Sequence, residues 1–373
     1  MASKYLISFQ LDTNLDYVNM NQVARNYTID ILRGFAIITM IGSNLAGELL
    51  KLPHPIYITI FGSMAAPFFI ILAGYLVTMG VREKEYGFSY FFIRGLLTIL
   101  TGAIIDSLLW GIYPFFSIDV LYLTGFAIIL TYFFTKLNLD ARIILTLVLF
   151  LAGPLVRNYF GYSELPPSYF FKPKDGQVSS NVISLFEYLK LWLIDGWFPF
   201  FSWLGISFLG SLFYELKRKN TDSSDKFYFY SILFSLILIS LGTYLIPFEN
   251  RYLIRGTYTE LFYPPTLAYY LHYIPFMLIL YLLVDYNSHL FVYIPFRIIG
   301  MSPMFFYFFH FILISKFAIP YWGKKRLNDL NEIEYFKTYL AILFICYLFS
   351  FLLKWIKMKW EKPPFIVKFF IGG

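Results

Sequence analysis

Long apolar segments alternate with short polar connections along most of the chain. Each segment approaches or exceeds the roughly 17–25 residues that a helix needs to cross a bilayer. The pattern predicts an all-α integral membrane protein with about ten transmembrane helices. The expected spans lie near residues 28–50, 56–80, 91–113, 119–135, 141–157, 197–216, 227–247, 264–286, 298–322 and 336–356. An additional apolar helix at about 182–194, on the outer surface or dipping into the membrane, would make eleven.

The composition agrees with this class, because 58% of the residues are hydrophobic and 14% are charged, against about 25% charged in soluble proteins. In a membrane protein the net charge of +7 indicates topology and not nucleic-acid binding. With the N-terminus inside, most lysines and arginines fall on the cytoplasmic side, so both termini are predicted to be cytoplasmic. We expect a cytoplasmic tail over residues 1–27, one polytopic domain over 28–356 and a second cytoplasmic tail over 357–373, in the cell membrane.

The first expected span carries an ordered set of polar residues. Asp30, Arg33, Asn44 and Glu48 follow one another at spacings that place them on one face of a helix. A charge at the bilayer centre costs at least about 2.5–3.5 kcal/mol, so this stripe is expected to face the protein interior or a wet cavity. His54 follows in the next loop, on the predicted extracytoplasmic side.

Three segments, taken in order, resemble one known family. The first holds Asp-x-x-Arg-Gly from Asp30, then Asn44, His54, and Pro67-Phe-Phe with Gly74 beyond it. The second is WFPFFSWLGISFLGSLF (Trp197–Phe213) and the third is IGMSPMFFYFFHFILI (Ile299–Ile314). Together they are similar to the catalytic domain of heparan-alpha-glucosaminide N-acetyltransferase and to its prokaryotic relatives.

That resemblance implies a transmembrane acyltransferase. An acetyl group would pass from cytoplasmic acetyl-CoA, the co-substrate, to an amine or hydroxyl of a sugar or lipid-linked glycan on the extracytoplasmic side. CoA is anionic and needs a basic cytoplasmic mouth, for which guanidinium groups offer paired donors. Arg33, Arg82 and Arg94 are all expected near the inner face. The simpler interpretations are a salt bridge to Asp30 for Arg33 and ordinary positive-inside topology for the other two.

His54 and Asn44 are the candidate catalytic residues. An imidazole titrates near pH 6.5, so His54 could take a proton from the attacking group or carry the acetyl group as an acyl-imidazole. Asn44 could hydrogen-bond the thioester carbonyl or the developing oxyanion. The plainer alternatives are an exposed loop histidine and a polar contact between helices.

His310 lies within the ninth expected span and matches the third family segment. We therefore group it with Arg33, Asp30 and Arg94 as a candidate for binding the donor. A buried histidine that only bonds a neighbouring helix is the alternative for this residue.

The chain departs from the family at Ser63, four residues before Pro67, where the family usually carries an aspartate. If that aspartate orients the histidine or binds the acceptor amine, another group must serve here. The candidates expected in the outer half of the membrane are Asp106, Asp195 and Glu187.

Two other functions are compatible with the sequence. The polar stripe would suit a transporter or flippase for a lipid-linked sugar or small solute, and His310 could be the reactive residue of a different membrane acyltransferase. No Walker loop, His-Glu-x-x-His or Cys-x-x-Cys pattern is present, so no metal site is indicated. The expected partners are the bilayer, acetyl-CoA and a glycan acceptor. The acceptor's identity, the choice of N- or O-acylation and the formation of a homodimer are left open.

Overall fold

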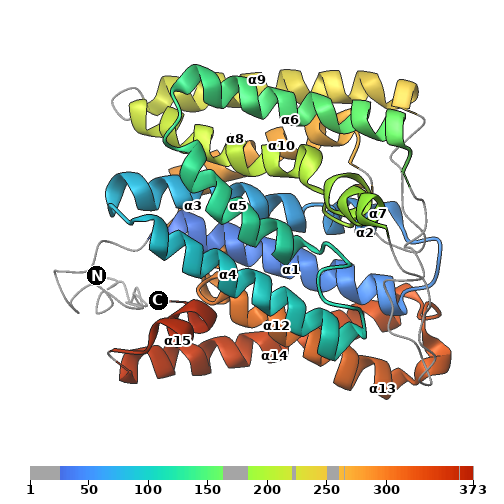
Figure 1. The fold of residues 1–373 in the computed structure, drawn as a ribbon. Coiled ribbons are helices and arrows are strands. Elements are labelled where there is room, and N and C mark those ends of the chain that lie inside the picture. The colour runs from blue at the N-terminus through green and yellow to red at the C-terminus, as the bar shows by residue number, and fades with distance from the viewer. Residues whose placement is uncertain are drawn as a thin grey trace, which may run out of the picture.

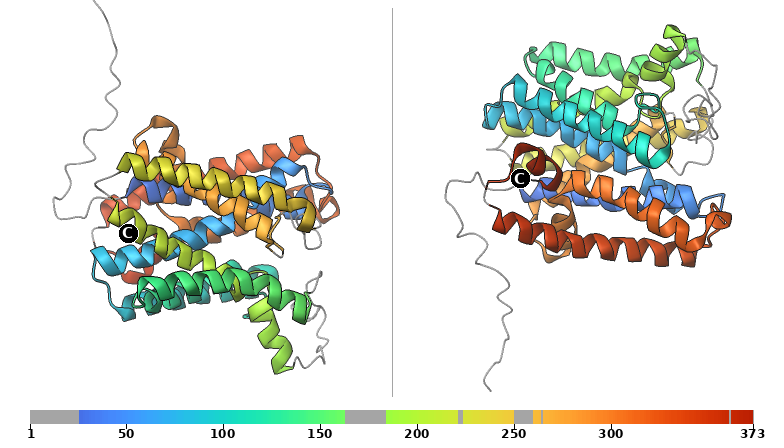
Figure 2. Two further views of the ribbon diagram at one scale, coloured as in Figure 1. Left: turned by 90° about the horizontal axis from the view of Figure 1, so that it is seen from above. Right: turned by 60° about the horizontal axis from the view of Figure 1, so that its bottom comes forward.

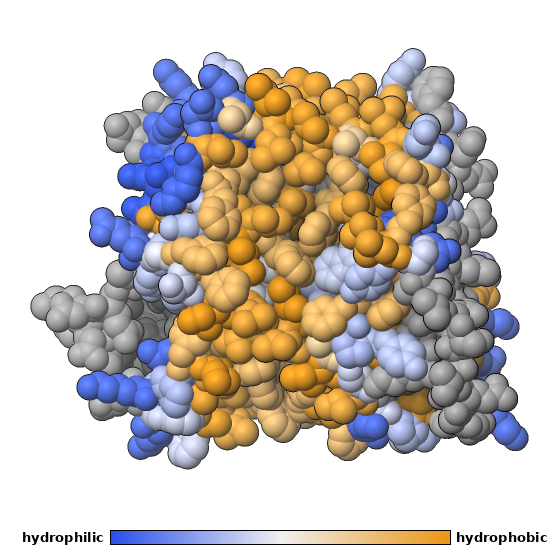
Figure 3. Space-filling view, viewed as in Figure 1, coloured by the Kyte–Doolittle hydropathy of each residue, from blue (hydrophilic) through white to orange (hydrophobic). Residues whose placement is uncertain are grey.

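The computed structural model describes residues 26–162, 184–220, 224–249, 260–263, 265–360 and 362–372. Within these ranges the regular structure is helical, and strand-like pairing is limited to an isolated bridge between Leu50 and Leu330. The long helices lie side by side in one bundle (Figure 1). On the face shown in Figure 3, a broad apolar band separates two polar ends. The all-α membrane fold predicted from the sequence is confirmed.

The helices follow the chain in a simple order. They are α1 (Tyr27–Leu49), α2 (Ile56–Gly62), α3 (Ala65–Glu83), α4 (Phe88–Ile105), α5 (Val120–Phe134), α6 (Leu139–Phe160), α7 (Leu185–Lys190), α8 (Phe200–Lys219), α9 (Ser224–Leu245), α10 (Leu267–Tyr286), α11 (Ile294–Gly300), α12 (Pro303–Leu313), α13 (Ile319–Trp322), α14 (Glu332–Lys359) and α15 (Phe365–Ile371). Short π-helical segments extend α4 over Asp106–Trp110, follow α7 over Leu191–Asp195 and join α12 to α13 over Ile314–Ala318.

Eight helical segments of the described chain are long and apolar enough to cross a membrane. They are Tyr27–Leu49, Ile56–Glu83, Phe88–Trp110, Leu139–Phe160, Asp225–Leu245, Leu267–Tyr286, Pro303–Trp322 and Glu332–Lys359. These correspond to eight of the ten expected spans. The other two, 119–135 and 197–216, are helices as well: α5 is apolar but has only 15 residues, and α8 ends in a basic turn.

The helix expected at 182–194 is present as α7 and the π-helical segment Leu191–Asp195. It lies at one end of the bundle, against the loop before α5. Two backbone hydrogen bonds tie its exit to that loop, from Trp197 N to Ser117 O (3.2 Å) and from Phe198 N to Ile118 O (2.9 Å). This helix therefore caps the bundle end near its junction with α8.

Two expected spans are interrupted in the structure. The second span breaks between α2 and α3 at Ser63 and Met64, and the ninth breaks between α11 and α12 at Met301 and Ser302. Hydropathy does not detect such breaks, because the residues at both are apolar or small. Broken helices at membrane depth are tolerated where they are buried in protein, and the first of these breaks lies next to the candidate site.

The beginning of α1 and the end of the chain lie at the same end of the bundle (Figure 1). The Arg297 guanidinium lies 4.6 Å from the ring centre of Tyr27, and Ser302 Oγ donates to Ile371 O (2.5 Å). Residues 357–373, expected as a tail, comprise the last turn of α14 and the helix α15, which packs back against α12. Figure 2 shows this short helix folded onto the bundle.

Candidate functional site

Helix α1 lies in the interior of the bundle and is contacted by α2, α3, α10, α11, α12 and α14. The approach of α11 depends on two glycines, since a Cβ on Gly34 would lie 1.8 Å from Phe296 O and a Cβ on Gly300 would lie 1.7 Å from Asp30 O. On another side, the Tyr335 hydroxyl donates to Gly42 O across 2.9 Å. Of the stripe residues, Asp30 is buried, whereas Arg33, Asn44 and Glu48 are half-buried.

Asn44 meets His310 across the interface of α1 and α12. Their side chains are joined by a 2.9 Å hydrogen bond between Asn44 Nδ2 and His310 Nε2. The other ring nitrogen, Nδ1, lies 3.0 Å from Phe306 O. A carbonyl can only accept, so Nδ1 carries the proton and Nε2 accepts from the Asn44 amide. The pair joins two candidate residues that the sequence places 266 positions apart.

His310 sits in a fully buried, aromatic environment. Its ring packs against Phe311, with centroids 4.0 Å apart, and edge-on against Tyr307 at 5.8 Å. The Tyr307 hydroxyl donates to the Asp119 carboxylate across 3.1 Å. Asp119 also caps the first turn of α5. This packing holds the His310 ring in place, so that the orientation of the Asn44 amide is determined by its neighbours.

His54 lies in the loop that follows α1. This loop is tied to the segment before α14, because Lys51 N donates to Leu330 O (3.0 Å) and Leu330 N donates to Leu49 O (2.9 Å). His54 is half-buried, and its Nε2 donates to Leu50 O across 3.2 Å. Nδ1 is then the basic nitrogen of the neutral ring. Burial lowers the pKa of His54 from its ordinary value, and the hydrogen bond to Leu50 opposes this in part.

The three arginines expected at the donor's entrance, Arg33, Arg82 and Arg94, lie toward the opposite end of the bundle. Arg82, in the last turn of α3, pairs with Glu215 across 2.9 Å. Arg33 pairs with the buried Asp30 across 3.6 Å within the first turns of α1. Arg94 on α4 lies 3.4 Å from the Tyr90 hydroxyl and over the Phe369 ring of α15. Eleven residues of helix separate Arg33 from Asn44, a rise of about 16 Å. The bundle therefore carries Arg33 and Arg94 toward one end and the Asn44–His310 pair toward the other.

Ser63 stands at the break between α2 and α3. Its hydroxyl donates to Thr59 O (2.7 Å) and accepts from Leu261 N (2.7 Å), while the Tyr269 hydroxyl donates to its carbonyl (2.8 Å). The residue before Leu261 is Glu260, which is buried, and whose carboxylate accepts a hydrogen bond from Ser43 on α1. The Glu260 carboxylate thus lies near Ser63 in the bundle, although Glu260 belongs to a segment far away in the sequence.

The three acidic residues proposed from the sequence to replace an aspartate at Ser63 are engaged elsewhere. Asp106 accepts from Ser117 and Tyr122, each across 2.8 Å. Asp195 pairs with Lys190 across 3.2 Å, and Glu187 closes the capping box of α7. Sequence analysis missed Glu260 because it falls between the expected spans 227–247 and 264–286. The apolar run Leu261–Tyr263 that follows it was the available signal for a buried segment.

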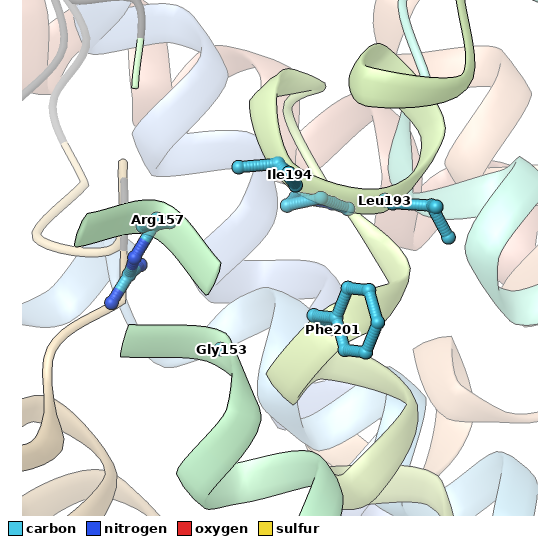
Figure 4. Close-up of a pocket in the computed structure, with 6 residues that line it drawn as sticks. Gly153, Arg157, Leu193, Ile194 and Phe201 are labelled. Carbon is cyan, nitrogen blue, oxygen red and sulfur yellow. The ribbon is translucent and has the colours of Figure 1, made fainter. Parts of the chain in front are cut away.

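Two of the small cavities in the described structure are lined by neither Asn44 nor His310. One, of about 10 Å³, lies between the end of α6 and the beginning of α8, with Arg157 and Phe201 on its wall (Figure 4). The other, of about 20 Å³, is apolar and lies between Leu32, Phe68 and Tyr281. Each could hold about one water molecule, far less than a sugar or a thioester requires. Within the described ranges, no group of three His, Cys, Asp or Glu side chains is gathered for a metal ion.

The fold and this site define a polytopic membrane protein with a hydrogen-bonded asparagine–histidine pair between α1 and α12. The model of the family described as heparan-alpha-glucosaminide N-acetyltransferase, catalytic, matches residues 25–256, which is more than half of the 373-residue chain. The chain belongs to this family of transmembrane acetyltransferases. The match includes Asp30, Arg33, Asn44, His54 and Arg94 and ends before His310. No curated protein matches the chain.

Proposed function

We propose that this protein transfers an acetyl group from cytoplasmic acetyl-CoA to the amine or hydroxyl of a sugar or glycan on the extracytoplasmic side of the cell membrane. The observation that carries the proposal is the Asn44–His310 hydrogen bond, in a chain of this family. Both termini are cytoplasmic in this proposal, so α1 begins at the donor side. Asn44 lies five residues, or about 8 Å, before the end of α1. The reaction then takes place in the extracytoplasmic third of the membrane.

His54 is the general base in this scheme. The amine nitrogen attacks the thioester carbonyl carbon, a carbon–nitrogen bond forms, and His54 Nδ1 takes the nitrogen's proton. The carbon–sulfur bond then breaks, and the departing thiolate takes the proton from His54 to give free CoA, which returns the ring to its neutral form. The lowered pKa of His54 keeps the ring neutral at pH 7, and the Leu50 carbonyl orients it. An acyl-imidazole on His54 is the alternative route, and it would appear as a labelled protein when acetyl-CoA is supplied without acceptor.

Asn44 stabilises the oxyanion that forms on the thioester carbonyl. Its amide nitrogen carries two protons, one of which is donated to His310 Nε2. The second proton forms the hydrogen bond to the oxyanion. Because His310 holds the amide in one orientation, little reorganisation is needed when charge develops, which is the condition for effective electrostatic catalysis. His310 is therefore a positioning residue for Asn44 in this proposal, rather than a group that touches the phosphates of CoA.

Arg33 and Arg94 would receive the phosphates of CoA at the cytoplasmic end. The rise of about 16 Å between Arg33 and Asn44 requires an elongated donor, whose anionic part stays at the inner face while its thioester reaches Asn44. Asp30 keeps Arg33 in place when the donor is absent. In this proposal the helices at the inner end separate to admit the donor.

The test is acetyl-CoA turnover by detergent-purified protein, with free thiol as the readout and glucosamine as trial acceptor. Acceptor-dependent thiol release by wild type, and its loss in His54→Ala, is the expected result. Stable protein that neither binds nor consumes acetyl-CoA would overturn the proposal in favour of a transporter or flippase without covalent chemistry.

A further inference from the structure

Helix α14 is long enough to extend into the headgroup layers on both sides of a bilayer. It has 28 residues, a rise of about 42 Å, against about 40–45 Å for a bilayer with its headgroup regions. Large apolar side chains are exposed along its outer face, as contact with lipid requires. They include Leu340, Phe344, Leu348, Leu352 and Trp355. The last turn of α14, with Lys357 and Lys359, therefore lies at the level of the lipid headgroups.

Helix α15 turns back from the end of α14 and packs against the beginning of α12 (Figure 1). Its inner side is fixed there, because Phe369 is buried and Ile371 O accepts a hydrogen bond from Ser302 Oγ across 2.5 Å. Lys357 Nζ, from the last turn of α14, donates to the same Ser302 Oγ across 3.0 Å. The end of α14 and α15 thus form one braced corner over residues 354–371, which we call the C-terminal elbow.

The outer side of the C-terminal elbow carries positive charge. Residues 354–371 include five lysines and one acidic residue. Lys359 and Lys362 are exposed, while Lys354 and Lys368 are half-buried. In the part of the chain that the structure describes, the salt bridges do not include any of these four lysines. Their charge is therefore left for a partner outside the chain.

The same side of the molecule is also apolar. Exposed aromatic and aliphatic side chains stand between the lysines along the sequence, and they are Trp355, Met358, Trp360, Phe365 and Ile366. Those on α14 continue the lipid-facing side of a transmembrane helix. This continuity favours the bilayer as the partner, because a soluble acidic protein would have to cover side chains that are already in contact with lipid.

We propose that the C-terminal elbow binds the headgroups of anionic phospholipids. Lysines beside the end of a transmembrane helix attract anionic lipid, since its headgroup keeps a net negative charge that a zwitterionic headgroup lacks. Trp355 and Trp360 suit the boundary between headgroups and acyl chains, where an indole places its ring in an apolar layer and its N–H in a polar one. This inference goes beyond the proposed acetyl transfer and does not depend on it.

The experiment places the full chain in phosphatidylcholine vesicles in which about 20% of the lipid is either brominated phosphatidylglycerol or brominated phosphatidylcholine, so that the two differ in charge. Bromine quenches tryptophan fluorescence on contact. The signal of the C-terminal elbow is the fluorescence that is lost in Trp355→Phe/Trp360→Phe. We expect this signal to be quenched at least about threefold more strongly by phosphatidylglycerol than by phosphatidylcholine.

Two matched sets of lysines separate a defined surface from general positive charge. The preference for phosphatidylglycerol should disappear in the elbow variant, Lys359→Gln/Lys362→Gln/Lys368→Gln. It should persist in the control variant, which removes three exposed lysines from the ends of α3, α5 and α8, Lys84→Gln/Lys136→Gln/Lys219→Gln. It should also persist in the charge-conserving variant, Lys359→Arg/Lys362→Arg/Lys368→Arg.

Equal quenching of the elbow signal by the two brominated lipids in wild type would overturn the inference, whether or not any lysine variant folds. An equal loss of preference in the elbow and control variants would also overturn it, because positive charge anywhere at this end would then suffice. Displacement of phosphatidylglycerol by inorganic phosphate at constant ionic strength would assign the lysines to a free anion and likewise contradict the proposal.

Discussion

Asn44 donates a hydrogen bond to His310 across 2.9 Å, and the histidine can accept it only because its other nitrogen donates to Phe306 O. The consequence is an amide of defined orientation inside the bundle. Both residues could be named from the sequence, but their contact could not. It changes the role assigned to His310 from a donor-binding candidate to the group that holds Asn44.

Removing either member of this pair has a distinct expected result. Asn44→Ala should lower kcat by about 10²–10³, the usual effect of losing one oxyanion donor. His310→Ala should cost less, and His310→Gln should restore much of the activity because an amide oxygen can also accept from Asn44. Thiol release at saturating acetyl-CoA is the measurement. Equal losses in His310→Ala and His310→Gln, in protein with normal unfolding temperatures, would contradict the positioning role.

The dependence of activity on pH follows from His54. Its neutral form is the base, and burial lowers its pKa below the ordinary 6.5. Activity should therefore be constant at neutral pH and fall as the pH drops through a midpoint below 6.5, where the ring becomes protonated. Initial rates of thiol release between pH 4.5 and 8 check this. A midpoint above 6.5 would show that the ring is not held in its neutral form by burial.

The proposed binding site for the phosphates of acetyl-CoA is tested by substituting two arginines, with a third arginine as the control. Arg33→Gln and Arg94→Gln should each raise the KM for acetyl-CoA severalfold, because each removes a paired donor from the proposed phosphate site. Neither should alter the KM for the acceptor. Arg218, exposed in the last turn of α8, is the matched control. A similar effect of Arg218→Gln would mean that general positive charge at this end, and not a defined site, attracts the donor.

The close crossing of α1 and α11 predicts that a substitution at Gly300 lowers the stability of the protein. A Cβ on Gly300 would lie 1.7 Å from Asp30 O, a backbone atom, so Gly300→Ala must push the two helices apart. We expect a loss of at least about 1–3 kcal/mol in stability, typical of overpacking, and lower activity because Asn44 moves relative to α12. Gly87→Ala is the control, since nothing lies within 4 Å of its Cβ. Thermal unfolding in detergent compares them, and equal unfolding temperatures would show that the crossing is not tight.

The sequence predicted the helical class and the positions of the spans well, because apolar length is a local property that each segment carries by itself. The expectation that the stripe on α1 faces inward is met by the buried Asp30, whereas Arg33, Asn44 and Glu48 are half-buried. It did not predict the break at Ser63, since Phe61–Ala66 is as apolar as the surrounding helix. Pro67 is the local signal, because a proline cannot donate to the carbonyl four residues earlier, which is that of Ser63. The contacts of Ser63 with Leu261 and Tyr269 are tertiary, and no local pattern contains them.

The sequence singled out the individual residues of the candidate site, but it did not predict the contact between Asn44 and His310. Spacing on one helix could relate Arg33 to Asn44, but the contact with His310 depends on how α12 packs against α1. Glu260 was missed for the same reason, because its partner Ser43 is 217 residues away. Assignments of His54, Asn44, Arg33 and Arg94 to steps of a reaction remain predictions that the experiments above address.

The most direct test of the central claim is thiol release from acetyl-CoA by purified wild type, Asn44→Ala and His54→Ala in parallel, with and without glucosamine. The account predicts acceptor-dependent release by wild type, a loss of about 10²–10³ in Asn44→Ala and a loss of about 10²–10⁴ in His54→Ala, with acetyl-CoA binding retained in all three. Full activity in either variant, or no acetyl-CoA binding by stable wild-type protein, would contradict it.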